Sequence, residues 1–327
     1  MSCSEISKRI RPKYNMSSLK LGGVAFARNV FTDYELIEKQ VQMTWHPDNR
    51  YCFVVDKNAK DDFKQRIEQL VGCFEDQMVM LPVSLYMDSA GHNQNLGHTQ
   101  CMEALLRFPN WSYVMLLQNH DLITKSVYEL DRVFEIMGGA ADATSYWERA
   151  KRRLIGSKWD PKSLKFFRNE SLVPAHVLST PLTFVSGLVE ASLPRAAVQW
   201  LIETEYASDE QFMSILQINS QLGMPGHFTN DCLDQGIIVN QVSRFSQWAR
   251  TGSVNCATKT ARHGICLFGI EDLRAMSELQ PVAWNKGSIK VQYHKNHNNP
   301  EYKLNCTSSR KQRSYDEYLD EQRFQWL

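Results

Sequence analysis

Three places along this sequence carry carboxylates from which a side chain could act on a ligand. Asp56 ends the apolar run YCFVVD, and Asp121 ends a second apolar run, WSYVMLLQNHD. Asp209-Glu210 follows Ser208 and precedes the apolar segment QFMSILQ. A carboxylate within reach of a substrate proton can serve as a general base. On the residues alone, Ser208 and its two acids are more typical of a helix N-terminus, where serine caps the helix and the dipole favours acids.

The sequence lacks the short motifs of several large enzyme classes. It contains no GxGxxG, GxxxxGK(S/T), GxSxG or HExxH motif. Their absence argues against dinucleotide oxidoreductases, P-loop NTPases, α/β-hydrolases and zinc metalloproteases. No Asp-x-Asp motif follows an apolar strand, so a metal ion held by the diphosphate of a sugar nucleotide is not indicated.

The charge of the chain is nearly balanced, with 37 Lys and Arg residues against 36 Asp and Glu residues. Domains that bind nucleic acid through bulk electrostatics usually have a clear basic excess, so that class is disfavoured. The polar stretch 140–174 nevertheless holds a basic cluster. The cluster could belong to a substrate-binding loop or to a solvated surface, and composition alone favours the solvated surface. The cluster consists of Arg149, Lys151, Arg152 and Arg153.

Cysteines and sequons indicate the cellular compartment. None of the eight cysteines lies in a CxxC pair, and they fit either disulfides in an oxidising compartment or buried free thiols. Four Asn-x-Ser/Thr sequons favour the secretory lumen. The start, MSCSEISKRIRPKY, has no apolar segment of a signal peptide, so we expect a luminal fragment or a chain without its first exon. The sequons begin at Asn15, Asn110, Asn169 and Asn305.

The elements that must position these groups alternate between strand and helix. A β-α-β opening is predicted over residues 21–56, with Asp56 at the carboxyl end of its second strand, where open α/β sheets place ligands. The run that ends at Asp121 repeats this arrangement. No linker or repeat is present, so one α/β domain over residues 1–327 is expected. Further helices are predicted over 61–74, 92–108, 126–137, 193–204 and 210–219, and strands near 79–83 and over 182–187.

A series of short segments resembles the core-2/I-branching β-1,6-N-acetylglucosaminyltransferase family (glycosyltransferase family 14), and most closely its nematode-type members. The order and spacing of the segments carry the resemblance along nearly the whole chain. The family also includes peptide O-xylosyltransferases. The matching segments are SCSEISKRIRPKY, YCFVVDK, MDSAGHNQNLGHTQCM, WSYVMLLQNHDLITK, FVSG, SDEQFMSILQ, RFSQW, and CATKTARHGICLFGIEDL followed by WNK.

The resemblance implies a GT-A-type glycosyltransferase fold, in which a Rossmann-like nucleotide-binding half is joined to an acceptor-binding half. It also implies transfer from a UDP-sugar with inversion, and without a metal ion or other cofactor. The family's catalytic base is the glutamate of an (S/P)-D-E motif, which falls on Glu210 here. The resemblance therefore favours a catalytic role for Glu210, in which the carboxylate removes the proton of the attacking acceptor hydroxyl.

Fixed cations would stabilise the leaving diphosphate in such an enzyme. The family uses an arginine in its last small disulfide loop. Counting from Cys256 places it at Arg262, and counting from Cys266 places it at His263. Arg262 is the better candidate, because arginine stays charged and binds phosphate bidentately. A second family cation, a lysine, falls on Lys286.

Two further positions match ligand-binding residues of the family. Asp56 matches an aspartate near the nucleotide base, although a strand-end acid that caps a turn is an equal alternative. Trp248 matches a tryptophan that lines the acceptor sugar, although a lone tryptophan is as often a core residue. A family tyrosine two residues later is Arg250 here, which suggests a different acceptor.

The resemblance also implies disulfide pairings for six cysteines. Cys306 matches a family cysteine whose partner lies upstream of the first residue, and Cys232 has no counterpart, so a pairing between these two is a guess. The implied bridges are Cys3–Cys73, Cys52–Cys101 and Cys256–Cys266.

We therefore expect an enzyme that transfers GlcNAc from UDP-GlcNAc to an O-glycan acceptor in the Golgi lumen. A full-length chain with an N-terminal anchor would be a type II membrane protein. The expected partners are the UDP-sugar donor and a glycan or glycoprotein acceptor, with no nucleic acid and no membrane contact except through such an anchor. The alternatives are a UDP-xylose-dependent xylosyltransferase and a catalytically silent sugar-binding protein.

Overall fold

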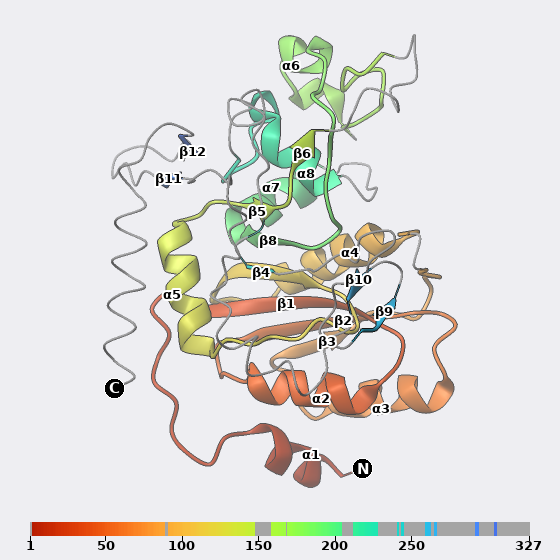
Figure 1. Cartoon of the computed structure of the whole chain (residues 1–327), viewed down its shortest axis with the longest axis vertical. Coiled ribbons are helices and arrows are strands. Elements are labelled where there is room, and N and C mark those ends of the chain that lie inside the picture. Colours follow the sequence, from red (N-terminus) through yellow and green to blue (C-terminus); the bar gives the residue numbers. More distant parts are fainter. Residues whose placement is uncertain are drawn as a thin grey trace.

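A six-stranded mixed sheet forms the centre of the computed structural model, in the order β3-β2-β1-β4-β8-β5 (Figure 1). Strands β1 to β4 are parallel, whereas β8 is antiparallel to β4 and β5 is antiparallel to β8. These strands span Gly23–Val30 (β1), Arg50–Val55 (β2), Met78–Met80 (β3), Trp111–Leu117 (β4), Asp142–Ala143 (β5) and Ala191–Pro194 (β8). The structure describes residues 2–88, 91–147, 158–167, 169–204, 212–227, 241, 243–244, 259–262, 265–266, 292–293 and 304–305.

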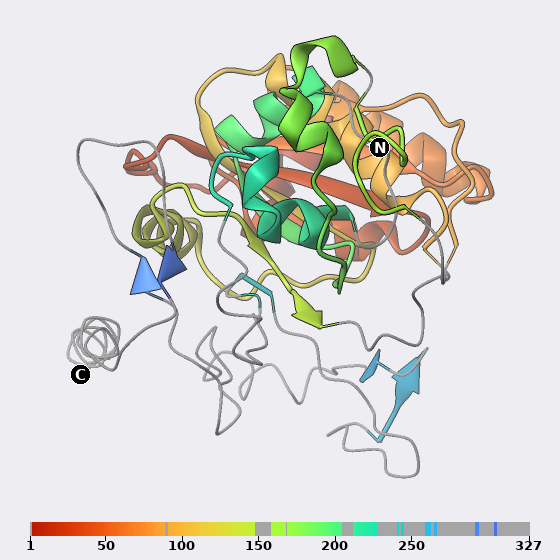
Figure 2. The same ribbon diagram turned by 90° about the horizontal axis from the view of Figure 1, so that it is seen from above.

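Helices cover both faces of this sheet. Helices α1, α2, α3 and α5 share a hydrophobic core with one face, and α4, α7 and α8 share a second core with the other face. In the view from above, the green and teal segments, which include α7 and α8, lie across the strands (Figure 2). The helices span Cys3–Ile10 (α1), Tyr34–Met43 (α2), Asp61–Gly72 (α3), Gln94–Leu106 (α4), Val127–Met137 (α5), Arg195–Thr204 (α7) and Phe212–Ile218 (α8).

The central strand β1 shows why the strand sequences are apolar throughout. All eight of its residues are buried, and neighbours such as Val24 and Ala25 pack into the two different cores. Burial on both sides is typical of parallel strands that helices cover. The strand begins at Gly23, where a Cβ atom would lie 1.8 Å from the carbonyl oxygen of Asp48. The α/β fold class predicted from the sequence is confirmed.

Two helices begin with a capping box. In α5, the Ser126 hydroxyl accepts the amide proton of Glu129, and the Glu129 carboxylate accepts that of Ser126. Ser2 and Glu5 do the same at the start of α1, a helix that the sequence patterns did not predict. Each box satisfies amides that the first turn of a helix leaves unpaired.

Two of the expected disulfides are confirmed. Cys3–Cys73 joins α1 to the end of α3, and Cys52–Cys101 joins β2 to α4. Cys266 is disulfide-bonded as well. Its expected partner Cys256 lies outside the described residues, as do Cys232 and Cys306. Among the described residues, no helix is both long and apolar enough to cross a membrane.

The strand predicted over residues 182–187 is largely wrong. Only β7 (Val185–Ser186) forms there, and it pairs with β6 (Tyr146–Trp147) rather than with the central sheet. The amide of Leu182 donates to the carbonyl of Trp159 at 2.8 Å, and the side chain of Asn219 binds both backbone groups of Thr183 at 2.8 and 2.9 Å. A backbone satisfied in this way needs no neighbouring strand. The central sheet is extended by β8 and β5 instead.

Candidate active site

The carboxyl ends of β1, β2 and β4 meet at one edge of the sheet (Figure 1). The chain leaves β1 through α2 on one face and reaches β4 through α4 on the other face. The order of the strands therefore reverses between β1 and β4. Open α/β sheets bind ligands at such a point, outside the carboxyl ends of the strands. The residues that follow the three strands there form the candidate site.

Asp56, directly after β2, is buried and ties two loops together. Its Oδ1 accepts the amide of Asn58 at 2.7 Å, and its Oδ2 accepts the amide of Met87 at 2.5 Å. Its own amide donates to the carbonyl of Val30 at the end of β1. These bonds perform the turn-capping role that was one of the two expectations. Binding of the sugar-nucleotide donor by Asp56 stays a prediction. Asp56 lies at the edge of the sheet where such ligands bind.

Asp121, after β4, lies at the centre of a partly buried ionic network. Its Oδ1 accepts Nη2 of Arg244 at 2.8 Å, and its Oδ2 accepts the amide of Gln118 at 2.8 Å. Burial opposes ionisation, yet Arg244, the Gln118 amide and Arg28 together hold the pKa of Asp121 below its usual range. The carboxylate therefore stays ionised at neutral pH.

Arg28 supports the loop after β4 from within the sheet. It is 4% exposed, and its Nη1 donates to the carbonyl oxygens of Gln118 at 3.1 Å and Asp121 at 2.9 Å. Burial lowers the pKa of Arg28 to about 10, so the guanidinium remains charged at neutral pH. The loop after β4 is thus held by a cation from β1 as well as by Arg244.

Arg244 joins a distant part of the chain to this network. Besides Asp121 it contacts Glu190, with 3.1 Å between Nη2 and Oε1. Burial disfavours its charge, but the carboxylates of Asp121 and Glu190 raise the pKa of Arg244. The preceding Ser243 donates from its amide (2.7 Å) and hydroxyl (2.6 Å) to Asp142 in β5. Residues 243–244 are therefore fastened to the sheet beside the carboxyl end of β4.

Asn119 joins the loops after β1 and β4. Its Oδ1 accepts the amides of Phe31 at 2.7 Å and Thr32 at 3.1 Å. The ring of Phe31 meets the ring of His120, the residue after Asn119, edge to face, with centroids 5.7 Å apart and planes at 77°. Phe31 is 41% exposed although it is a large apolar side chain. The site therefore presents an aromatic pair to the outside at the strand-order reversal.

A buried polar layer lies between the first turns of α4 and the ends of β1 and β4. Asn29 donates to the carbonyl of Gln94 at 3.0 Å, and Nε2 of His98 lies 3.1 Å from the carbonyl of Leu117. Burial lowers the pKa of His98 to about 4, so the ring is neutral and donates from Nε2. Several buried atoms here have no hydrogen-bond partner in the described part of the chain. They are Asn29 Oδ1, Asn95 Nδ2 and Oδ1, His98 Nδ1 and Gln118 Nε2.

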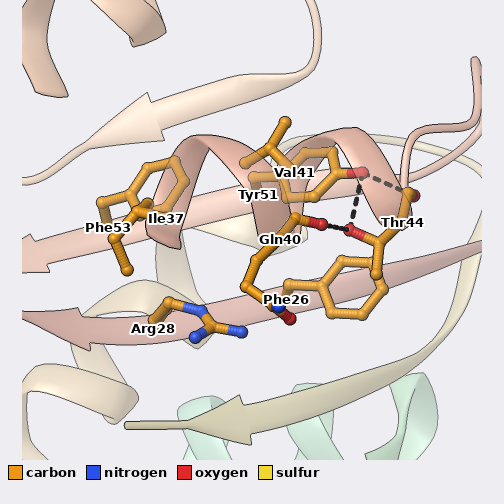
Figure 3. Close-up of a pocket in the computed structure, with 8 residues that line it drawn as sticks. All are labelled: Phe26, Arg28, Ile37, Gln40, Val41, Thr44, Tyr51 and Phe53. Atoms are coloured by element: carbon orange, nitrogen blue, oxygen red, sulfur yellow. Dashed lines mark hydrogen bonds between the residues drawn. The ribbon is translucent and has the colours of Figure 1, made fainter. Parts of the chain in front are cut away.

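A small cavity lies on the other face, between α2 and strands β1 and β2 (Figure 3). Hydrogen bonds join Thr44 to Gln40 and Tyr51 on its wall. It has room for about one water molecule, so it is not a site for a nucleotide or a sugar. Its lining consists of Phe26, Arg28, Ile37, Gln40, Val41, Thr44, Tyr51 and Phe53.

The structure does not test most of the predicted site residues. Glu210, Trp248 and Lys286 lie outside the described residues. The backbone of Arg262 lies in β9 (Ala261–Arg262), which pairs with β10 (Ile265–Cys266) in a two-stranded antiparallel sheet. In the part of the chain that the structure describes, no cluster of three or more His, Cys, Asp or Glu residues could hold a metal ion.

The residues that support the site were not predicted from the sequence. Arg28 had a local signal, because an arginine in the otherwise apolar run GVAFARNV must find buried partners. Arg244 opens the matching segment RFSQW, but its pairing with Asp121, 123 residues away along the chain, had no local signal. The contact between Phe31 and His120 also had no sequence signal, because the two rings follow different strands.

One solved structure shows only a weak similarity to this chain. It is the mannosyltransferase PcManGT from Pyrobaculum calidifontis in complex with GDP-Man and Mn2+. The similarity covers 66% of this chain and 59% of that chain, with 11% sequence identity and a TM-score of 0.33. A TM-score this low does not establish a shared fold.

Sequence comparisons are more specific. A rat protein named beta-1,3-galactosyl-O-glycosyl-glycoprotein beta-1,6-N-acetylglucosaminyltransferase 3 is 24% identical over 297 residues, which cover 82% of this chain and 65% of that protein. The zebrafish protein with the same name and the number 4 is 22% identical over 290 residues, covering 82% and 66%. The chain thus spans about two-thirds of the length of these relatives. Residues 24–277 match the model of the Core-2/I-Branching enzyme family, and the chain belongs to that family.

Proposed function

We propose that this chain transfers GlcNAc from UDP-GlcNAc to an O-glycan acceptor and forms a β-1,6 branch. The observation that carries the proposal is the match of residues 24–277 to the Core-2/I-Branching enzyme family. The names of the rat and zebrafish relatives state β-1,6-N-acetylglucosaminyl transfer. They favour GlcNAc over xylose as the transferred sugar.

The proposed reaction is a single displacement with inversion. The carboxylate of Glu210 removes the proton of an acceptor hydroxyl, and that oxygen forms a bond to the anomeric carbon of the donor sugar. The bond between the anomeric carbon and the diphosphate oxygen breaks, and UDP leaves. One base suffices, because a single displacement forms no covalent enzyme intermediate.

The proposed donor and acceptor contacts divide between two groups of residues. The guanidinium of Arg262 and the ammonium of Lys286 stabilise the charge of the leaving UDP, in place of a metal ion. Asp56 lies at the donor side, and its position at the carboxyl edge of the sheet supports this role. Trp248 offers an aromatic face to the acceptor sugar.

The proposed location is the Golgi lumen, with a type II membrane topology in a full-length protein that carries an N-terminal anchor. The two disulfides Cys3–Cys73 and Cys52–Cys101 support an oxidising compartment of the secretory pathway. The four sequons support a glycoprotein. The proposed partners are the UDP-sugar and a glycan or glycoprotein acceptor.

The first prediction tests the base and the metal-free mechanism together. Glu210→Gln is expected to lower GlcNAc transfer about 100-fold to 10,000-fold, because it removes the general base. Glu203→Gln, which changes an exposed glutamate of α7, is the matched control and is expected to keep full activity. Transfer is measured with UDP-GlcNAc and O-glycan acceptors in EDTA.

Three outcomes would contradict parts of this proposal. Absence of transfer from any UDP-sugar, with UDP-GlcNAc still bound, would identify a silent sugar-binding protein. Transfer that EDTA abolishes and a divalent cation restores would exclude the metal-free mechanism. Transfer from UDP-xylose but not from UDP-GlcNAc would make the chain a xylosyltransferase.

A further inference from the structure

Phe31 exposes a large aromatic surface at the point where the strand order reverses. It directly follows β1, whose neighbours β2 and β4 end beside it. Its exposed fraction is 41%, whereas Val30, the residue before it, is 1% exposed. Ligands of open α/β sheets bind outside this edge, so the exposure of Phe31 coincides with the expected ligand position.

Hydrogen bonds fix the backbone of Phe31, and one aromatic contact restricts its ring. The amide of Phe31 donates to Asn119 Oδ1 at 2.7 Å, which ties its backbone to the loop after β4. Arg28 holds that loop through the carbonyls of Gln118 and Asp121, and Arg244 holds Asp121. The edge-to-face contact with His120 restricts the ring itself. A ring held in this way loses little conformational freedom when a ligand stacks on it.

We infer that Phe31 is a stacking surface for the planar base of the UDP donor and that His120 is its positioning residue. The inference rests on the proposed function, which supplies the nucleotide. A base can stack on an aromatic ring, and such a contact depends little on which base it is. Asp56 is a neighbour of this surface, because its amide donates to the carbonyl of Val30.

Calorimetric titration of the intact chain separates the base from the phosphates. The probes are UDP and inorganic diphosphate, which carries no base. Phe31→Ala is expected to weaken UDP binding about tenfold or more, since stacking of one base contributes that much. Phe31→Tyr keeps the ring and is expected to restore UDP binding. Diphosphate binding is expected to be the same in all variants.

Two further variants sharpen the test. Leu172→Ala removes an apolar side chain that is 79% exposed but lies in the 3-10 helix Glu170–Leu172, away from the sheet, and is expected to bind UDP normally. His120→Ala is expected to weaken UDP binding less than Phe31→Ala, because it leaves the stacking ring in place. In transfer assays, Phe31→Ala is expected to raise the KM for UDP-GlcNAc with the acceptor KM unchanged.

The outcomes distinguish this inference from the proposed function. Unchanged UDP binding in Phe31→Ala, with normal GlcNAc transfer by the wild type, would overturn the stacking role alone. Equal losses of UDP and diphosphate binding would overturn it too, because they indicate a structural defect. A wild type that neither binds UDP nor transfers sugar would overturn both. Normal UDP binding by His120→Ala would show that His120 does not position the Phe31 ring.

Discussion

At the scale of single residues, the Asp121 carboxylate binds the guanidinium of Arg244, and its charge also acts on Arg28, which binds the main-chain carbonyl of the same residue. Asp121→Asn is expected to lower the free energy of unfolding by about 2 kcal/mol, because Arg244 then keeps only Glu190 as a charged partner and Arg28 loses a nearby opposite charge. The measurement is denaturant unfolding at pH 7. Asp61→Asn is the matched control, since Asp61 is fully exposed beside Lys64 and such pairs contribute little. Equal effects of the two substitutions would contradict the partly buried network.

A second residue-scale prediction concerns His98 and pH. Burial lowers its pKa from about 6.5 in the unfolded chain to about 4, so between these values the unfolded state binds more protons. The protein is therefore expected to lose about 3 kcal/mol of stability through His98 as the pH falls from 6.5 to 4. Denaturant unfolding across this range measures the slope, which His98→Gln should reduce.

The control for this pH dependence is His176→Gln, which removes an exposed histidine and should leave the slope unchanged. Asp121 does not interfere in this window. Its folded pKa is lowered, so its contribution is present above the unfolded value near 4 and is lost only as the pH falls further. An identical slope in wild type and His98→Gln would show that the imidazole is not responsible.

At the scale of elements, α1 depends on a covalent bond to α3. The Cys3–Cys73 bridge spans 70 residues, and chain-entropy estimates for such a loop give about 4 kcal/mol. Replacing both cysteines by serine is expected to lower the free energy of unfolding by about 2–5 kcal/mol, as measured by denaturant unfolding. Ser2→Ala removes only the cap of the same helix and is expected to cost about 1 kcal/mol. A double-serine variant no less stable than Ser2→Ala would contradict the role of the bridge.

Elements with strong periodic patterns could be predicted from the sequence. The apolar runs of β1, β2 and β4 and the amphipathic helices α2 and α3 were all expected. Strand β8 was not expected, because its sequence ASLP (Ala191–Pro194) is short and leads directly into a helix. The segment 182–187 was predicted as a strand because it is apolar, but Asn219 satisfies the backbone of Thr183. A bond between residues 36 positions apart leaves no local pattern.

At the scale of the whole molecule, the candidate site combines groups from segments that only the complete fold brings together. Asp56 and Asp121 could be placed in advance, because each ends an apolar strand and parallel strands end at one edge. The partners of Asp121 could not be predicted from the sequence, since Arg28 precedes it by 93 residues and Arg244 follows it by 123. The family resemblance supplied Glu210, Arg262 and Lys286 by motif position, and those roles stay predictions.

The position of β1 in the sheet also constrains how the protein is made. One side of β1 pairs with β2 soon after both are synthesised, but its other side pairs with β4, where Arg28 lies opposite Leu117. At typical rates of translation, synthesis of the intervening chain takes on the order of ten seconds. During that time the nascent chain carries an apolar strand with one open hydrogen-bonding edge, which is a template for aggregation. Chaperones that cover this edge until Leu117 emerges would therefore raise the yield of folded protein.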